Sequence, residues 1–447
     1  MIIFYIICPL VLAMSYYLNL YPLVVIVLMF FFVDYYKSEK KYPSRQLLLS
    51  LFLFLLFHNY WIYSLYPWVG GKIAALFLTL GLTLYFFVFF FIFFKLIRII
   101  KEQPFSFIIL GIAWTIFERL LTLGPFGYPF YSLYLTQVYA PYLYIAYNPF
   151  GASLLTFGLV SITAFIAKLI VCKEKQEKYI PGLLFIILLL IVLTGIRSLL
   201  PEKAAHNQRQ LQVALVQTDV KEELRHNADY YENLLNNYLQ LLTFVVSKEK
   251  NLDVIILPES IIPALWENKI VRLLNENDVI GKKVLIFGLP ARRDNKIYNS
   301  VMFYRDGNVE KNYYKNHLVP FGERVPWLFG FLRPMDLVDY DASRTIEPVT
   351  IQSVRYGTVI CYESAFPALY KRIKDSDLFL VLTNDAWFHA CFKELHLRSA
   401  ICRAAEYRKY LLFVSNGGKS AVIDENGRIR RILPSNKEGY IIYKVPL

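Results

Sequence analysis

Charge is scarce in this sequence. Only 19% of its 447 residues are Asp, Glu, Lys or Arg, whereas 56% are hydrophobic and 17% are aromatic. This composition excludes an ordinary soluble protein, and the length exceeds that of a single domain. The five cysteines make no disulfide framework, because Cys8 and Cys172 lie in or beside apolar runs. The sequence also has no glycine-rich phosphate loop and no repeat of solenoid period.

The charges that are present are unevenly distributed. Residues 1–199 carry 14 Lys or Arg and 6 Asp or Glu, and residues 200–447 carry 34 and 29. We therefore expect a membrane domain over 1–199 and a globular domain over 200–447. Most of the excess positive charge lies in short loops between apolar runs, so we expect the lipid bilayer as a partner and no nucleic acid.

Apolar runs in the first part predict a polytopic α-helical membrane domain of about seven spans. Most of the runs reach the about 18–20 residues that a helical span needs, but the second is short, so the first two are either full spans or a tight hairpin. Residues 1–18 lack a basic start and a small-residue cleavage site, which predicts an anchor instead of a removed signal peptide. The runs are about 1–18, 20–36, 47–66, 73–94, 105–123, 150–167 and 180–199.

Basic residues recur in every second loop between these runs. This positive-inside pattern predicts a cytoplasmic N-terminus and, after an odd number of spans, a chain that emerges on the far side from about Leu200 onward. The basic residues are Lys37, Lys40, Lys41, Arg45, Lys95, Arg98, Lys101, Lys168, Lys173, Lys175 and Lys178.

Two features of the membrane part permit more than one interpretation. Glu118 and Arg119 lie within the fifth run, either as functional charges or as a pair at the level of the interface. As sequence neighbours they face different sides of a helix and need not pair with each other. The aromatic stretch 124–148 is typical of a belt at the outer interface, and it is either the floor of a lipid-entry site or an anchor.

The second part alternates strand-like and helix-like segments. This order predicts an α/β domain with helices covering the faces of a two-sheet sandwich. The expected strands are 211–217, 252–257, 284–289, 299–304, 356–360, 378–382, 411–414 and 420–423, and the expected helices are 229–248, 262–275, 365–375 and 396–408.

Three chemically distinctive sites stand out, each at the end of a predicted strand. Glu259 comes directly after an apolar strand and a proline, Lys315 and Glu323 bracket a loop that contains Pro and Gly, and Cys361 ends the run Tyr356–Ile360. Each has a structural alternative: a helix N-terminal acid, a solvated loop and a buried structural thiol. A Glu, a Lys and a Cys in this order form a specific signal, because a thiol of pKa about 8.5 needs a base or a neighbouring cation to become a nucleophile.

Several longer motifs surround these residues. They are Pro258-Glu259, Lys315-Asn-His-Leu-Val-Pro-Phe-Gly-Glu323, Cys361-Tyr-Glu363, Thr383-Asn-Asp-Ala-Trp-Phe388, Trp114-x-x-x-Glu118 and Asn416-Gly-Gly-x-Ser420. Over nearly the whole chain this pattern resembles the apolipoprotein N-acyltransferase family, membrane-bound members of the nitrilase superfamily. The resemblance implies a nitrilase-like α-β-β-α sandwich over 200–447 on the periplasmic side of a bacterial inner membrane.

The resemblance also implies an activity. A fatty acyl chain would pass from a membrane phospholipid to a thioester on Cys361, and then to the N-terminal amine of a diacylglyceryl-modified apolipoprotein. In that mechanism Glu259 is the base, Lys315 stabilises the oxyanion and Glu323 orients Lys315, with no cofactor and no metal. The supporting, substrate-binding residues would be Tyr362, Glu363, Asn384 and Trp387. A mobile lid would contain Trp266, Trp327, Phe329 and Phe331, for each of which core packing is the alternative.

The sequence departs from the family pattern in three places. Thr218-Asp219 stands where the family has Gly-Asn, and the usual tryptophan is absent from 221–227. His389 to His396 replaces the usual Gly, Pro and Gln-His segment. The family also tends to end in a further membrane helix, whereas a polar, strand-like segment precedes Leu447.

Three alternative functions and one alternative metal site remain open. A membrane-tethered amidase or nitrilase would use the same trio but pass the acyl group to water. A cysteine hydrolase would pair Cys361 with His317, which leaves Glu259 unexplained. A transporter would need more polar residues in its spans than the sequence offers. A metal site at His389, Cys391 and His396 has loose spacing.

Overall fold

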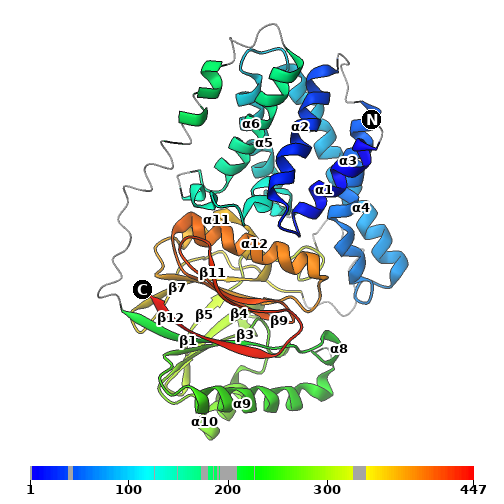
Figure 1. Cartoon of the computed structure of the whole chain (residues 1–447). Coiled ribbons are helices and arrows are strands. Elements are labelled where there is room, and N and C mark those ends of the chain that lie inside the picture. The colour runs from blue at the N-terminus through cyan, green and yellow to red at the C-terminus, as the bar shows by residue number, and fades with distance from the viewer. Residues whose placement is uncertain are drawn as a thin grey trace. The chain divides into compact units, whose positions relative to one another are not determined.

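The computed structural model describes residues 3–38, 44–124, 126–147, 150–172, 180–184, 186–188, 191, 209–225, 227–325 and 339–447. The chain forms two compact units (Figure 1). One unit comprises Met1–Pro201 together with Phe388–Arg398, and the other comprises Glu202–Trp387 together with Ser399–Leu447.

The first unit is helical. Its long helices are apolar on most of their surface, as expected for segments that contact both lipid and protein. The helices described here are α1 (Phe4–Ser15), α2 (Tyr21–Lys37), α3 (Arg45–His58), α4 (Lys72–Ile97), α5 (Ser106–Leu121) and α6 (Ser153–Val171), with 3-10 turns η1 (Tyr60–Leu65), η2 (Arg98–Ile100), η3 (Pro129–Tyr131), η4 (Leu133–Gln137) and η5 (Leu143–Ala146).

Within the described residues, three segments are long and apolar enough to cross a membrane: Arg45–Leu65, Lys72–Ile100 and Ser153–Val171. The helix Phe4–Ser15 is apolar but has only 12 residues. The last expected run, 180–199, lies largely outside the described residues. The count of about seven spans therefore stays a prediction.

Glu118 and Arg119 have separate partners inside the helical unit. The Glu118 carboxylate accepts hydrogen bonds from Trp114 Nε1 at 3.2 Å, the Leu133 N–H at 2.8 Å and Thr156 Oγ1 at 2.9 Å. Arg119 Nε donates to Ser153 Oγ at 2.9 Å. The buried carboxylate thus fastens the start of η4 to α5 and α6.

The second unit is built on two six-stranded sheets, ordered β12-β1-β2-β3-β4-β5 and β11-β10-β9-β8-β7-β6. In the first sheet, β1 pairs in parallel with β2 and antiparallel with β12 along its whole length. The strands are β1 (Gln210–Gln217), β2 (Val254–Ile256), β3 (Val284–Arg293), β4 (Lys296–Arg305), β5 (Asn308–Tyr314), β6 (Val349–Ile351), β7 (Val354–Ile360), β8 (Leu378–Asn384), β9 (Leu411–Asn416), β10 (Ser420–Ile423), β11 (Ile429–Leu433) and β12 (Gly439–Pro446).

Helices cover the outer face of each sheet, which gives four layers (Figure 1). α9 (Tyr231–Lys248) and α10 (Glu267–Asn277) bury Leu234, Leu242 and Ile270 against the first sheet. α11 (Pro367–Arg372) and the last part of α12 (Ala390–Tyr407) pack their aromatic rings on Phe379 of β8. The inner faces of the sheets meet at Phe303 and Tyr356, whose ring centroids are 5.6 Å apart.

Candidate active site

Three strand ends bring the distinctive residues together. Glu259 follows β2, Lys315 directly follows β5, and both strands run in the same direction within the first sheet. Cys361 directly follows β7 in the second sheet, where β7 and β8 are parallel. A hydrogen bond of 2.8 Å from the Asn384 N–H, at the end of β8, to Glu259 Oε2 joins the two sheets at this edge.

Lys315 lies between two carboxylates. Its Nζ is 2.8 Å from Glu323 Oε1 and 3.6 Å from Glu259 Oε1, and the side chain is fully buried. Asn299 of β4 uses one amide nitrogen to bridge the same two oxygens, because Nδ2 donates to each of them at 2.7 Å. Glu323 is fixed further, since its Oε2 accepts from the Val319 N–H at 2.8 Å. The two carboxylates therefore differ in their distance from the ammonium group: Glu323 is in close contact with it, and Glu259 lies farther away.

Cys361 occupies a strained position at the turn out of β7. Its φ is +49°, a left-handed conformation that non-glycine residues adopt at a cost and that is often found at functional sites. The residue is 7% exposed and begins the short helix η9 (Cys361–Ala365). The strand thus holds the backbone still while the turn sets the direction of the thiol.

Burial and charge act together on the protonation of these groups. Burial raises the pKa of Glu259, Lys315 lowers it and Glu323 raises it, with a net shift above the ordinary value. Burial pulls the pKa of Lys315 down, but the carboxylates of Glu323 and Glu259 together raise it above its usual range. Burial and Glu259 raise the pKa of Cys361, whereas Lys315 lowers it. The resting site therefore combines a thiol, a buried carboxyl group that can accept its proton and a permanent cation.

Glu363 connects the loop after Lys315 with the cysteine turn. Its Oε1 accepts from the backbone N–H groups of Asn316 at 2.6 Å and His317 at 2.9 Å. Its Oε2 accepts from the Ile360 N–H and from the Tyr313 hydroxyl, both at 2.8 Å. Because four donors converge on one fully buried carboxylate, Glu363 fixes the distance between the loop after Lys315 and the turn that carries Cys361.

The chain matches two family models. The carbon-nitrogen hydrolase family matches residues 212–447, and the apolipoprotein N-acyltransferase N-terminal domain matches residues 9–165. The apolipoprotein N-acyltransferase of Haemophilus influenzae is 30% identical over 76% of this chain and 68% of its own length. The chain belongs to the apolipoprotein N-acyltransferase family. The relatives from Pasteurella multocida (30% identical, 77% of this chain and 69% of the relative) and Aquifex aeolicus (29%, 76% and 76%) carry the same name.

In this member of the apolipoprotein N-acyltransferase family, the supporting residues predicted from the sequence have different surroundings. Tyr362 packs its ring near Phe366, at 4.9 Å, and near His317, at 5.8 Å. Asn384 uses its side chain within the protein, since Nδ2 donates to Glu222 Oε1 and Oδ1 accepts from Asn416 Nδ2. Trp387 is half-buried in the loop between β8 and α12.

The structure gives Trp266 of the expected lid, and the histidines of the alternative sites, surroundings that the sequence did not indicate. Trp266 stacks under Lys269 Nζ, 4.1 Å from the ring centroid, on the outer helical layer, and 327, 329 and 331 lie outside the described residues. Burial and Lys315 lower the pKa of His317 to about 4, and its ring packs 4.1 Å from that of Phe366. His389 binds the Tyr60 hydroxyl through Nε2 at 2.8 Å within the helical unit.

Sequence reasoning missed Asn299, Tyr313, Glu222 and Arg225. Asn299 begins an expected strand and Tyr313 lies outside every expected strand, and a single sequence contains no signal that β4 and β5 would place them beside Glu259 and Glu363. The buried pair on the short helix α8 (Glu222–Arg225) looks like a solvated charge run for the same reason.

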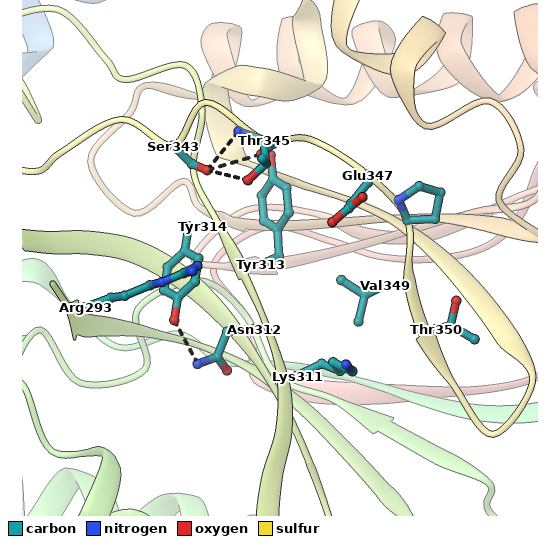
Figure 2. A pocket seen from close by; sticks show the side chains of 11 residues that line it. Arg293, Lys311, Asn312, Tyr313, Tyr314, Ser343, Thr345, Glu347, Val349 and Thr350 are labelled. Carbon is teal, nitrogen blue, oxygen red and sulfur yellow. Dashed lines mark hydrogen bonds between the residues drawn. The ribbon is translucent and has the colours of Figure 1, made fainter.

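A cavity of about 290 Å³ lies beside the edge strands β5 and β6 (Figure 2). Tyr313 forms part of its wall, and the hydroxyl of the same residue binds Glu363. Neither Cys361 nor Glu259 lines it. The lining residues are Arg293, Lys311, Asn312, Tyr313, Tyr314, Ser343, Thr345, Glu347, Pro348, Val349 and Thr350, all labelled in Figure 2 except Pro348.

Proposed function

We propose that this protein transfers a fatty acyl chain from a membrane phospholipid, through a thioester on Cys361, to the N-terminal amine of diacylglyceryl-cysteine on apolipoproteins. The observation that carries the proposal is the convergence of Glu259, Lys315 and Cys361 at one sandwich edge in a chain of the apolipoprotein N-acyltransferase family. The proposal makes the chain an N-acyltransferase that acts in lipoprotein maturation.

The first half-reaction forms the thioester. Cys361 Sγ attacks the ester carbonyl carbon of the phospholipid while Glu259 takes the thiol proton. Lys315 Nζ stabilises the negative charge that develops on the carbonyl oxygen. When the tetrahedral intermediate collapses, the C–O bond breaks, Glu259 returns the proton to the glycerol oxygen and lysophospholipid leaves.

The second half-reaction uses the same groups in the same order. The α-amine of the diacylglyceryl-cysteine attacks the thioester carbonyl carbon, Glu259 takes the ammonium proton that forms, and the C–S bond breaks. The products are an amide and Cys361, which recovers the proton. The raised pKa of Glu259 supports this role. A group that accepts a proton and then returns it within one catalytic cycle works best when its pKa lies near the working pH.

The protein that performs this reaction is proposed to have a membrane domain over 1–199 and a periplasmic catalytic domain over 200–447, in the inner membrane of a bacterium. Basic residues in alternate loops and the apolar helices of the first unit support this topology. Both substrates are then lipids of the same membrane as the enzyme.

A second function uses the same trio with water as the acceptor, that of a membrane-tethered amidase or nitrilase-type hydrolase. The carbon-nitrogen hydrolase match over 212–447 favours keeping it as the alternative.

The fate of the acyl group separates the two functions. The purified full chain in detergent is incubated with phospholipid carrying a labelled acyl chain and with a synthetic diacylglyceryl-cysteine peptide. A transferase places the label on the peptide amine, and the label disappears from the peptide when its N-terminus is acetylated. Release of labelled free fatty acid at the same rate with and without the peptide would contradict the proposal.

A further inference from the structure

A buried ion pair lies on α8, outside the catalytic trio. Glu222 Oε1 and Arg225 Nη1 are 3.2 Å apart, and their side chains are 2% and 4% exposed. Burying two charges costs desolvation, so such a pair adds little stability compared with apolar residues of similar size. Its presence therefore suggests a task that apolar residues could not perform.

Each member of the pair contacts a neighbour of the same catalytic residue. Glu222 Oε1 accepts from Asn384 Nδ2 at 2.7 Å, and the Asn384 N–H donates to Glu259 Oε2 at 2.8 Å. Arg225 Nη2 donates to the carbonyl oxygen of Ser260, the residue after Glu259. The pair is thus linked to the carboxylate of Glu259 through Asn384 and to the backbone beside Glu259 through Ser260.

The backbone that Arg225 holds is strained. Ser260 has a φ of +47°, a left-handed conformation that surrounding contacts must enforce in a residue other than glycine. On its other side the segment lies against Gly288, whose N–H donates to the Pro258 carbonyl at 3.0 Å and whose carbonyl accepts from the Ile261 N–H at 2.9 Å. The turn that carries Glu259 is therefore held by hydrogen bonds to β3 on one side and to Arg225 on the other.

We propose that Glu222 and Arg225 are positioning residues for the general base, which hold the carboxylate of Glu259 in its working orientation toward the Cys361 thiol. The inference rests on the proposed function, in which Glu259 takes the thiol proton. It assigns a task to the stretch 221–227, where the sequence departs from the family pattern.

The test measures the rate of thioester formation and the pH dependence of Cys361 alkylation. If the pair positions Glu259, its loss slows thioester formation but makes the thiol easier to alkylate at low pH. In the full-chain variant Glu222→Gln/Arg225→Met both charges are gone, so no unpaired charge remains buried, and glutamine can still accept from Asn384. Thioester formation with labelled phospholipid should fall about 10- to 100-fold, as expected when a catalytic group loses its support. Alkylation of Cys361 by iodoacetamide, followed by peptide mass spectrometry against pH, should shift to lower pH, because a displaced Glu259 raises the thiol pKa less.

The matched control removes an ion pair between an exposed arginine and a half-buried aspartate, at the opposite end of β7 from Cys361. Arg355 Nη2 and Asp377 Oδ1 are 2.8 Å apart, and Arg355→Met/Asp377→Asn should leave both readouts at wild-type values. Thermal unfolding reports whether each variant is folded. If the double variant of α8 does not fold, Arg225→Lys decides, because lysine keeps the charge opposite Glu222 but does not reach both partners of Arg225; we expect about a tenfold slower thioester formation.

Three results would overturn the inference. They are wild-type rates of thioester formation in the folded α8 variant, a slower reaction with an unchanged alkylation profile, and an unchanged rate in Arg225→Lys should that variant be the one to decide. If the wild-type protein itself forms no thioester, the proposed function fails, and the alkylation profile alone still tests whether the pair positions Glu259.

Discussion

Replacing Lys315 by methionine removes the only cation that the described contacts place between Glu259 and Glu323. Lys315 Nζ lies 2.8 and 3.6 Å from their Oε1 atoms, so each attraction is about 5–6 kcal/mol at an effective dielectric of about 20. Desolvation offsets much of this gain, and removal of one partner from a buried pair costs about 3–5 kcal/mol. In a domain of this size each kcal/mol of lost stability lowers the Tm by about 2–4 °C, so the Tm should fall by about 6–20 °C.

The loss in Lys315→Met should depend on pH. In the wild type the pKa of Lys315 is raised, so its stabilising effect is fully present below its ordinary pKa, throughout the range from pH 5 to 8. In the variant the pKa of Glu259, already raised by burial, loses the cation that lowers it. When the pKa of an acid is higher in the folded than in the unfolded state, ionising that acid lowers the free energy of unfolding. The loss is complete above the folded-state pKa and disappears as the acid is protonated at lower pH. The deficit should therefore be largest near pH 8 and smaller near pH 5.

The assay is thermal unfolding of the full chain in detergent at several pH values. Lys311→Met is the matched control, since Lys311 lies on β5, four residues before Lys315, and is exposed; the Tm of this variant should change by less than about 2 °C. Equal losses for the two variants, or a Lys315→Met deficit that is the same at pH 5 and pH 8, would refute the electrostatic account of the site.

Three further predictions follow from the same contacts. Glu259→Gln should slow thioester formation about 10²- to 10⁴-fold and yet shift Cys361 alkylation to lower pH, because the carboxylate raises the pKa of the thiol; slower alkylation at every pH would contradict this. His317→Gln should keep thioester formation within about tenfold of wild type, since the pKa of His317 is about 4, whereas a loss above about 10²-fold would favour a Cys361–His317 pair. Gly288→Ala should cost about 1–3 kcal/mol by chemical denaturation, because its Cβ would lie 2.4 Å from Ser260 N, and an unchanged midpoint would argue against the tight contact with the Glu259 turn.

The buried strands could be predicted from the sequence, and the strand-like segment expected before Leu447 is the edge strand β12, but the other three edge strands could not be predicted. The eight expected strands match β1 to β4 and β7 to β10, all of which include runs of buried residues. β5, β6 and β11 escaped prediction because they are edge strands, are short or charged, and have a weak hydrophobic alternation, as in Ile429–Leu433. α12 begins at Ala390 instead of near His396, since its first turns carry mixed polar residues.

The catalytic candidates were predictable for a chemical reason, and their supports were not. Glu259, Lys315 and Cys361 combine reactive groups with positions at strand ends, which a sequence displays directly. Asn299 and the Glu222–Arg225 pair act through contacts with residues about 25 to 160 positions away, such as the Asn384 amide on Glu222. Such partners become visible only when the sheets are folded together.

The most direct test of the central claim is to trap the acyl group. Purified wild-type protein mixed with phospholipid that carries a labelled acyl chain, and with no acceptor, should accumulate the label on the Cys361 peptide as an adduct that hydroxylamine removes. The adduct should be absent from Cys361→Ala and should move to a diacylglyceryl-cysteine peptide when that acceptor is added. A folded wild-type protein that transfers the label to the peptide while Cys361 stays unmodified, or a Cys361→Ala variant that still transfers it, would contradict the account.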